Sequence, residues 1–541
     1  MCGIGGFVDY DRDARESSVI AARMKRTLTP RGPDAEGEWC DLDACLVHRR
    51  LIVIDPDGGK QPMCSPDGNT VLVYNGELYN TEDIRRELLA QGHSFLGHSD
   101  TEVVLHAFLE WDVRAFERFN GIYAFALWQQ SERRLILCRD RLGVKPLFVS
   151  HTKGGIVFGS TIGTVLCHPE VEPVIDADGL RSLLLLGPAR PPASGVFQQI
   201  DSVLPGHYAI LTPERYIDRA YWKLEAHEHP DDLAATIART HELICDATTR
   251  QLVSDVPLAT FLSGGLDSSI LSMLAAKDYA TRGETLHTWS VDYRDNARYF
   301  EKSRFQPNSD SEFIGMMTDF LHTEHHNVIL EPEALCAALL PATDARDLPG
   351  MADVDSSLLL FCGQVKKDFT VCLSGECADE LFGGYPWYHR EEILFEDTFP
   401  WSRSVDLRLG LLAPGVVSDG TDFVRQHYLD TCRAADKLPG DGKKDARMRE
   451  MFKLNLDWFM ATLLERSVTK EYYAAAPFPM PILICSPFIV GRCDLTPPRL
   501  FIPEQMPLFI LRIFLKKELT RPSFCAIVIN TEGNIASKLG I

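Results

Sequence analysis

The chain has 541 residues, of which 45% are apolar and 24% are charged. A typical domain has ~100 to 200 residues, so at least two globular units are expected and a small disulfide-stapled module is excluded. The 76 Asp and Glu outnumber the 55 Lys and Arg and give a net charge of −21, which disfavours general binding to nucleic acid or anionic membrane surfaces.

The 15 cysteines are odd in number and scattered, and no basic segment followed by an apolar one opens the chain. The best candidate for a membrane span, residues 474–490, is interrupted by prolines at 477, 479, 481 and 487. We therefore expect a cytoplasmic protein with reduced thiols and with neither a membrane nor a nucleic-acid partner.

Short runs of β-branched and aromatic residues, separated by Gly, Pro and Asp, predict a strand-rich first unit over residues 1–221. The expected strands cover residues 4–9, 45–54, 70–75, 123–129 and 134–140. Two helices are expected over residues 81–91 and 101–111, the second after the capping candidates Ser99 and Asp100. This mixture predicts α/β layers with helices over sheets.

Position 2 holds the first candidate catalytic group. If Met1 were removed, the thiol of Cys2 would lie beside a free α-amine, whose reference pKa of ~7.7 to 8.0 lets it accept the thiol proton. Glycines at positions 3, 5 and 6 would let other backbone segments approach closely. A buried cysteine at the start of a strand is the alternative interpretation.

Four further segments accompany Cys2, namely Arg31-Gly32-Pro33-Asp34, His48-Arg49-Arg50-Leu51, Tyr74-Asn75-Gly76-Glu77-Leu78-Tyr79-Asn80 and Ser99-Asp100-Thr101-Glu102. Together with Cys2 they resemble the N-terminal-nucleophile glutaminases of the class II glutamine amidotransferases. The resemblance implies an αββα sandwich, in which the Cys2 thiolate attacks the side-chain amide of glutamine and releases ammonia.

The same resemblance implies roles for the surrounding residues. Asn75 and Gly76 would form the oxyanion hole, Arg50 would bind the α-carboxylate of glutamine, and Asp100 and Glu77 would contact its α-ammonium and polar edges. The implied glutamine-binding set also includes Leu51, Ile52, Val53 and Ile54. Taken alone, Asn75-Gly76 would be an ordinary β-turn, and Arg50 and Asp100 would be solvated charges.

A helix-rich second unit is expected over residues 222–466. A helical pattern over residues 233–252 and a short apolar run over residues 257–262 precede the loop Ser263–Ser269, and a further helical stretch covers residues 270–279. A strand, a glycine-containing loop and a helix can bind phosphate through loop amides and the positive helix end. The loop lacks the Lys of the GxxxxGK[ST] type.

This loop and residues 371–385 resemble the ATP-pyrophosphatases that adenylylate a carboxylate, which implies an α/β domain with a parallel sheet. Asp267 and Asp379 would hold Mg²⁺ on the pyrophosphate, and Glu376 would act as general base for ammonia attack. Cys377 stands where that family usually has glycine. The other implied nucleotide-binding residues are Phe261, Leu262, Ser263, Gly264, Gly265, Leu266, Ser268, Val291, Ser374 and Gly375.

A glutaminase followed by such a unit, over residues 1–466, resembles the glutamine-hydrolysing asparagine synthetases. The resemblance implies aspartate, glutamine and ATP as substrates, Mg²⁺ as cofactor, and a homodimer. An amidotransferase that adenylylates a different carboxylic acid is the alternative. The spacing of His322, His325 and His326 is weakly metal-like, but no acidic or Cys partner follows at a recognisable offset, so we expect no zinc site.

The family pattern stops near residue 466. Residues 467–541 have a net charge of +3 against −24 for the preceding residues, and they contain nine of the 32 prolines. We expect a poorly ordered tail without a long helix. A second alternative follows, in which glutamine hydrolysis survives and the synthetase activity is weak or absent.

Overall fold

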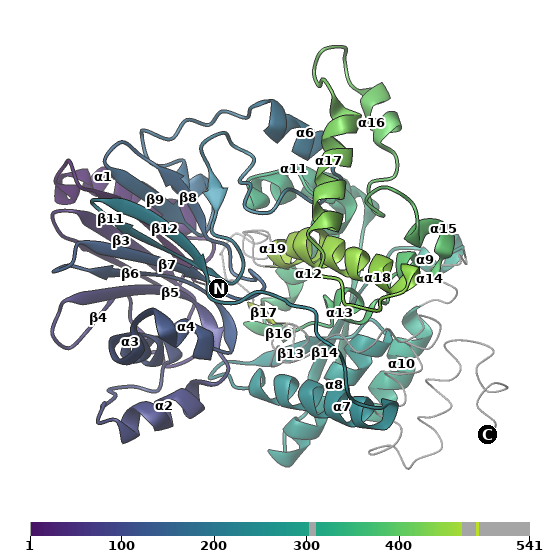
Figure 1. The fold of residues 1–541 in the computed structure, drawn as a ribbon. Helices are drawn as coiled ribbons and strands as arrows, with labels where there is room; N and C mark the ends of the chain where they lie inside the picture. The colour runs from purple at the N-terminus through teal and green to yellow at the C-terminus, as the bar shows by residue number, and fades with distance from the viewer. Residues whose placement is uncertain (1, 302–309, 468–482, 486–541) are drawn as a thin grey trace.

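The structure is a computed structural model that describes residues 2–301, 310–467 and 483–485 (Figure 1). In the N-terminal unit, two antiparallel sheets pack face to face. The first has the order β10 (Asp201–Ser202), β8 (Phe148–His151), β9 (Gly155–Gly159), β1 (Gly3–Asp9), β3 (Ala44–Arg50), β2 (Ala35–Cys40). The second has the order β12 (Arg215–Ala220), β11 (His207–Thr212), β7 (Arg134–Arg139), β6 (Gly121–Gln129), β5 (Thr70–Leu78), β4 (Met63–Cys64).

Helices cover the outer face of each sheet. Helices α1 (Ser18–Leu28) and α5 (Ile162–Val165) cover the first sheet, and α2 (Thr81–Ala90), α3 (Asp100–Trp111) and α4 (Ala115–Arg118) lie against the second. Along β1, Ile4 and Val8 are buried between the sheets, whereas Phe7 packs under the helices, as strand alternation requires. The predicted αββα sandwich is confirmed.

The second unit is built on a parallel sheet with the order β15 (Glu324–Leu330), β14 (His287–Tyr293), β13 (Leu258–Phe261), β16 (Val371–Leu373), β17 (Leu483–Cys485). Helices α7 (Leu233–Arg250) and α8 (Leu266–Thr281) lie on one face and α12 (Ala352–Val365) on the other. Thr260 bonds to Ser272 of α8 at 2.8 Å, while the ring of Phe261 lies 4.9 Å from that of Phe361 in α12. The predicted parallel α/β domain is confirmed.

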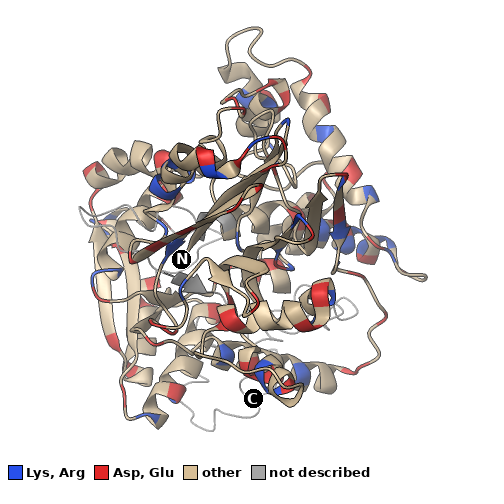
Figure 2. Cartoon of the chain, turned by 90° about the vertical axis from the view of Figure 1, so that its left-hand side faces the viewer, with Lys and Arg blue, Asp and Glu red and all other residues tan. Residues whose placement is uncertain are grey.

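Further helices complete the second unit (Figure 1). They are α9 (Asn296–Tyr299), α10 (Asp310–Leu321), α11 (Pro332–Arg346), α13 (Ala378–Phe382), α14 (Pro386–His389), α15 (Glu391–Leu394), α16 (Val405–Leu411), α17 (Gly420–Arg433), α18 (Lys443–Leu454) and α19 (Ala461–Ser467). Among the described residues, no helix combines the length and the apolar composition that crossing a bilayer requires. Acidic and basic residues are interspersed along the chain in both units (Figure 2).

The two units share one apolar cluster. Leu51, Val53, Ile122 and Val144 of the first unit belong to the same buried cluster as many residues of the second unit's sheet and helices. A polar contact lies elsewhere on the interface, where the N–H of Gly163 donates to Asp347 Oδ2 at 2.9 Å. The interface between the two units is therefore part of a hydrophobic core and is not formed by polar surface contacts alone.

Three expectations change. Cys40 and Cys45 form a disulfide, because the β2–β3 register places them opposite each other, so the expectation that all thiols are reduced is wrong at this pair. The strand predicted over residues 45–54 ends at Arg50, because the chain turns where the Arg50 side chain binds carbonyls further along. Helix α8 begins at Leu266, earlier than predicted. The prediction for residues 467–541 falls outside the described residues, except for Ser467 and β17.

Candidate active sites

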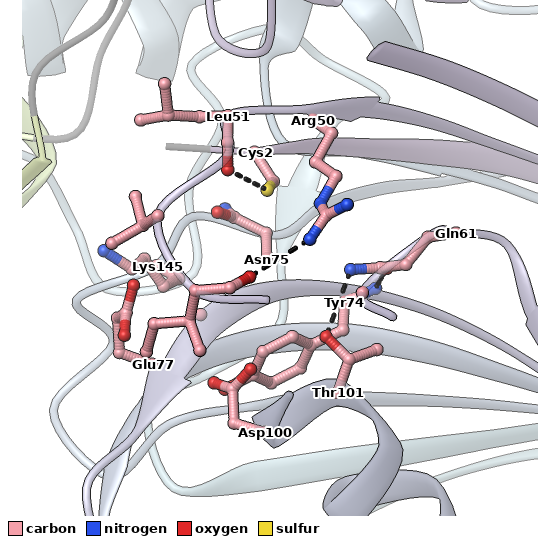
Figure 3. Close-up of a pocket in the computed structure, with 14 residues that line it drawn as sticks. Cys2, Arg50, Leu51, Gln61, Tyr74, Asn75, Glu77, Asp100, Thr101 and Lys145 are labelled. Carbon is pink, nitrogen blue, oxygen red and sulfur yellow. Dashed lines mark hydrogen bonds between the residues drawn. The ribbon is translucent and has the colours of Figure 1, made fainter. Parts of the chain in front are cut away.

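A pocket at the ends of β1, β3 and β5 brings most of the predicted glutaminase residues together (Figure 3). Its lining comprises Cys2, Arg50, Leu51, Val53, Ile54, Gly59, Gln61, Tyr74, Asn75, Gly76, Glu77, Asp100, Thr101 and Lys145. Of the predicted set, Ile52 alone does not line the pocket, and its N–H donates to Asp34 Oδ2 at 2.8 Å.

Cys2 lies in this pocket with its backbone held in place. Its thiol donates to the Leu51 carbonyl at 3.7 Å, and the fully buried Arg31 donates from Nε to the Cys2 carbonyl at 3.1 Å. Burial raises the pKa of the Cys2 thiol, and the positive N-terminus opposes that rise. A base close to the thiol is therefore needed to form the thiolate.

Asn75 has the properties of an oxyanion donor. It is 1% exposed, and neither Nδ2 nor Oδ1 of its side chain has a hydrogen-bond partner within the described part of the chain. An unpaired buried amide costs about 1 to 3 kcal/mol, which a bound ligand can recover. The next residue must be glycine, because a Cβ on Gly76 would lie 2.6 Å from the carbonyl oxygen of Ile122 in β6.

Opposite charges line the two sides of the pocket. The Arg50 guanidinium donates to the carbonyls of Ile54, Asp55 and Pro56 at 3.1, 2.6 and 2.8 Å. Gly59 leaves room for it, because a Cβ there would lie 2.2 Å from Arg50 Nη2.

The acidic side is formed by Glu77 and Asp100. Asp100 Oδ2 accepts from the Tyr74 hydroxyl and from the N–H of Leu78, each at 3.0 Å. Burial and the neighbouring Asp100 raise the pKa of Glu77 to about 8, while Lys145 opposes the rise. Figure 3 shows Glu77 beside Lys145. A cation on one side and two carboxyls on the other complement a zwitterionic amino acid.

Sequence reasoning missed four polar residues of the pocket. Tyr74 and Thr101 lie inside the segments that carried the resemblance, so their neighbours gave a signal. Gln61 accepts from the Tyr74 N–H at 2.6 Å, and the fully buried Lys145 follows β7. Neither carries a local pattern that would distinguish it from a surface residue.

The second site begins in the loop between β13 and α8. Ser263 and Ser268 bridge the loop, with their hydroxyls 3.0 Å apart, and the Ser268 hydroxyl donates to the Gly265 carbonyl at 3.2 Å. Gly264 has a φ of +79°, which favours glycine, and α8 begins directly after Gly265. The helix N-terminus and the loop amides form a site that suits an anion.

A second loop, between β16 and α13, lies against the first because β13 and β16 are adjacent and parallel. A Cβ on Gly375 would lie 3.1 Å from the Ser268 nitrogen and 3.2 Å from the Asp267 Cβ. The Ser374 hydroxyl accepts from the N–H of Glu376 at 3.2 Å. Cys377 has a φ of +72°, a conformation that favours the glycine usual in the related family.

The carboxyls of these two loops suit a divalent cation. Burial and then the charge of Asp379 raise the pKa of Asp267 to about 7, and burial also raises the pKa of Asp379. Two partly buried carboxyls that repel each other gain from a cation between them, and Mg²⁺ prefers such oxygen ligands together with phosphate. The donor set therefore fits the expected cofactor.

The remaining predicted nucleotide residues lie around these loops. Phe261 and Val291 pack against the large apolar cluster on the α12 side of the sheet. Leu262 is fully buried in a separate small cluster, and its N–H donates to the Trp289 carbonyl at 2.8 Å. Leu266 packs partly buried against the cluster between α7 and α8. Sequence reasoning gave no role to Glu380, which is fully buried and accepts from the Tyr385 hydroxyl at 2.7 Å.

The three histidines do not converge. His325 bonds to Thr288 at 2.9 Å, whereas His326 on the other face of β15 lies 3.0 Å from His287. The ligand atoms of His287, Glu324 and His326 lie within 4.8 Å of one another, a grouping that spans two strands and has no spacing signal in the sequence.

Comparison with known proteins matches both units. The family described as glutamine amidotransferase domain matches residues 1–222, and the family described as asparagine synthase matches residues 239–476. A solved structure of glutamine phosphoribosylpyrophosphate amidotransferase from B. subtilis, complexed with ADP and GMP, is 15% identical, with a TM-score of 0.32 over 61% of this chain and 81% of that chain.

Curated relatives include proteins from Bacillus subtilis strain 168. Asparagine synthetase [glutamine-hydrolyzing] 3 is 44% identical over 471 residues, which cover 86% of this chain and 76% of the relative. Asparagine synthetase [glutamine-hydrolyzing] 2 is 28% identical over 414 residues, which cover 71% of this chain and 52% of the relative. With both family domains in the same order and this level of identity, the chain belongs to the family of glutamine-hydrolysing asparagine synthetases.

Proposed function

We propose that the chain synthesises asparagine from aspartate, ATP and the amide nitrogen of glutamine, and releases glutamate, AMP and pyrophosphate. The observation that carries this proposal is the presence, on one chain, of a partly buried cysteine in the same pocket as an unpartnered amide, and of two adjoining loops that suit ATP and Mg²⁺. We assign the glutaminase to residues 1–221 and the ATP-binding domain to residues 222–466.

In the first half-reaction, Cys2 is the nucleophile and its α-amine, freed by removal of Met1, is the base. The thiolate attacks the amide carbon of glutamine, and the tetrahedral oxyanion is stabilised by the side-chain amide of Asn75 and the N–H of Gly76. Arg50 holds the α-carboxylate while Glu77 and Asp100 hold the α-ammonium, so the substrate is fixed at both ends. Collapse of the intermediate releases ammonia and leaves a thioester, which water hydrolyses to glutamate.

In the second half-reaction, the β-carboxylate of aspartate attacks the α-phosphorus of ATP and displaces pyrophosphate. The Ser263–Ser269 loop and the start of α8 bind the pyrophosphate. Asp267 and Asp379 would hold Mg²⁺, which would offset the negative charge of the pyrophosphate. Ammonia then attacks the β-carbonyl carbon of the β-aspartyl adenylate and displaces AMP, and Glu376 takes the proton that the nitrogen loses. The cytoplasm as location and a homodimer as assembly are part of the same proposal and stand on the family resemblance.

The test is a reaction with amide-¹⁵N-glutamine, aspartate, ATP and Mg²⁺, in which labelled asparagine, pyrophosphate and glutamate are measured together. Equal amounts of asparagine and pyrophosphate are expected, and Cys2→Ala should make asparagine only from added ammonium. Pyrophosphate released with another carboxylic acid and not with aspartate would identify a different amidotransferase. Glutamate without pyrophosphate would leave a glutaminase alone, the outcome that the altered composition after residue 466 favours.

A further inference from the structure

The loop of residues 51–59 determines where the Arg50 guanidinium lies. Three consecutive carbonyls of this loop, those of residues 54–56, accept from Arg50, and a Cβ on Gly59 would lie 2.2 Å from Arg50 Nη2. A displacement of the loop would therefore move the group that the proposed function assigns to the α-carboxylate of glutamine.

Asp55 ties this loop to the start of α3. Its side chain is buried, Oδ1 accepts from the Gly58 N–H at 2.8 Å, and Oδ2 accepts from the N–H groups of His98 and Ser99 at 2.7 and 3.0 Å. Ser99 caps α3, whose first residue is Asp100. The cationic and acidic sides of the glutamine pocket are thus joined through one carboxylate.

Asp255 reaches this junction from the second unit. It lies between α7 and β13, and its Oδ2 accepts from the Asp55 N–H at 2.9 Å and lies 3.0 Å from His98 Nε2. Its own N–H donates to the Val53 carbonyl at 3.1 Å. One residue of the synthetase unit therefore holds the glutamine loop at two backbone positions.

The chain that follows Asp255 runs into the candidate ATP site. Strand β13 begins three residues after it, and the Ser263–Ser269 loop follows that strand. On the other side, Arg250 of α7 forms a 3.1 Å ion pair with Asp83 of α2. The connection between α7 and β13 therefore contacts the glutaminase at both of its ends, through Arg250 and through Asp255.

We propose that Asp255 is a positioning residue for the glutamine site, which aligns Arg50 by fixing the loop of residues 51–59 from the neighbouring domain. The proposal rests on the assignment of Arg50 to glutamine. The hydrogen bond with His98 and the N–H of Asp55 lower the pKa of Asp255, so it is ionised at neutral pH, and hydrogen bonds to an ionised acceptor are stronger than neutral ones. The first domain alone therefore lacks a group that its substrate site requires.

The test measures glutamine hydrolysis and ammonium-dependent asparagine synthesis in Asp255→Ala and Asp255→Asn. We expect Asp255→Ala to raise the KM for glutamine about tenfold, as the loss of a hydrogen bond to a charged group predicts, while kcat changes less than about threefold. Asp255→Asn keeps an oxygen that accepts from the Asp55 N–H and should restore most of the affinity. Synthesis from ammonium should remain within about twofold of wild type, because no ATP-site residue is changed.

Arg181→Ala is the matched control. Arg181 lies on α6 (Ala177–Leu185) and donates from Nε to the Ser418 carbonyl at 2.9 Å, a contact with the second unit that does not involve residues 51–59. The KM of Arg181→Ala for glutamine should equal that of wild type. An unchanged KM in Asp255→Ala, or an equal loss of both reactions, would overturn the proposal. If Asp255→Ala does not fold, His98→Ala removes a side-chain partner of Asp255 and should raise the KM for glutamine, so an unchanged KM in His98→Ala decides against the proposal. Absence of glutamine hydrolysis in wild type would instead refute the proposed function.

Discussion

The role proposed for Asn75 follows from the hydrogen-bond partners that its side chain lacks. Its amide is buried and unpartnered within the described residues, whereas a structural asparagine would normally be satisfied. We predict that Asn75→Ala lowers kcat for glutamine hydrolysis by about 10²- to 10³-fold with little change in KM, as loss of an oxyanion donor does in other enzymes.

Asn75→Asp is the informative companion, because it keeps the size of the side chain and removes the donor. Stopped assays of glutamate release at saturating glutamine should show the same large loss in both variants. Synthesis from ammonium should stay at the wild-type rate in each. A kcat within threefold of wild type for Asn75→Asp would contradict the oxyanion role.

Glu77 gives the glutamine site a dependence on pH. Its pKa of about 8 means that it is mostly protonated at pH 7, whereas the proposed contact with the α-ammonium of glutamine requires the carboxylate. Binding must therefore release a proton, so the KM for glutamine should rise as the pH falls below about 8, by up to about tenfold per unit. Glu77→Gln should bind glutamine weakly with a KM that no longer follows this dependence.

The same shift has a consequence for stability. A carboxyl whose folded pKa is raised binds more protons in the folded state than in the unfolded state. Glu77 therefore contributes stability at low pH, and this contribution decreases as the pH rises from its ordinary value of 4.5 to about 8. Urea unfolding of wild type and Glu77→Gln between pH 5 and pH 9 should show the stability difference moving in favour of the variant and then levelling off.

At the scale of elements, the contact between the two ATP-site loops follows from strand order. Because β13 and β16 are neighbours, their carboxyl ends place Gly375 against Ser268 and Asp267, where a methyl group would lie 3.1 to 3.2 Å from its nearest atoms. We predict that Gly375→Ala pushes the loops apart by a few tenths of an ångström and lowers ATP-dependent pyrophosphate release by up to about tenfold, since misplacement by ~1 Å can cost 10²-fold.

Gly410→Ala in α16 provides the comparison, because a Cβ there would meet nothing within 4 Å. Glutamine hydrolysis should be unaffected in either variant. Normal pyrophosphate release in Gly375→Ala would show that the loops are not held at the separation that the reaction needs.

The elements also show how far sequence patterns reach. The helix expected over residues 101–111 was predictable, because helical periodicity and the cap at Ser99 are local signals, whereas the αββα order came from the family resemblance. The end of β3 at Arg50 was not, since a side chain returning to carbonyls 54–56 stops a strand that the apolar run alone would continue. Lys145 and the Cys40–Cys45 pair likewise depend on tertiary approach and on register, which no local pattern encodes.

For the whole molecule, the shared apolar cluster sets how the two domains unfold. Polar domain interfaces permit independent motion, but here Leu51, Val53, Ile122 and Val144 are buried in the second unit's core. Cavities in that core should therefore weaken both domains. The assignment of Asp255 to the glutamine loop depends on the same interface staying closed.

Leu286, which precedes β14, tests this coupling because it is 2% exposed and lies in the shared cluster. Leu286→Ala should cost about 2 to 5 kcal/mol, as buried Leu to Ala changes do. If the domains unfold together, the temperatures at which glutamine hydrolysis and pyrophosphate release are lost should fall by the same several degrees. Leu340→Ala, at a leucine that is 75% exposed in α11, should change neither temperature. A glutaminase that keeps its wild-type inactivation temperature in Leu286→Ala would show that the first domain unfolds on its own.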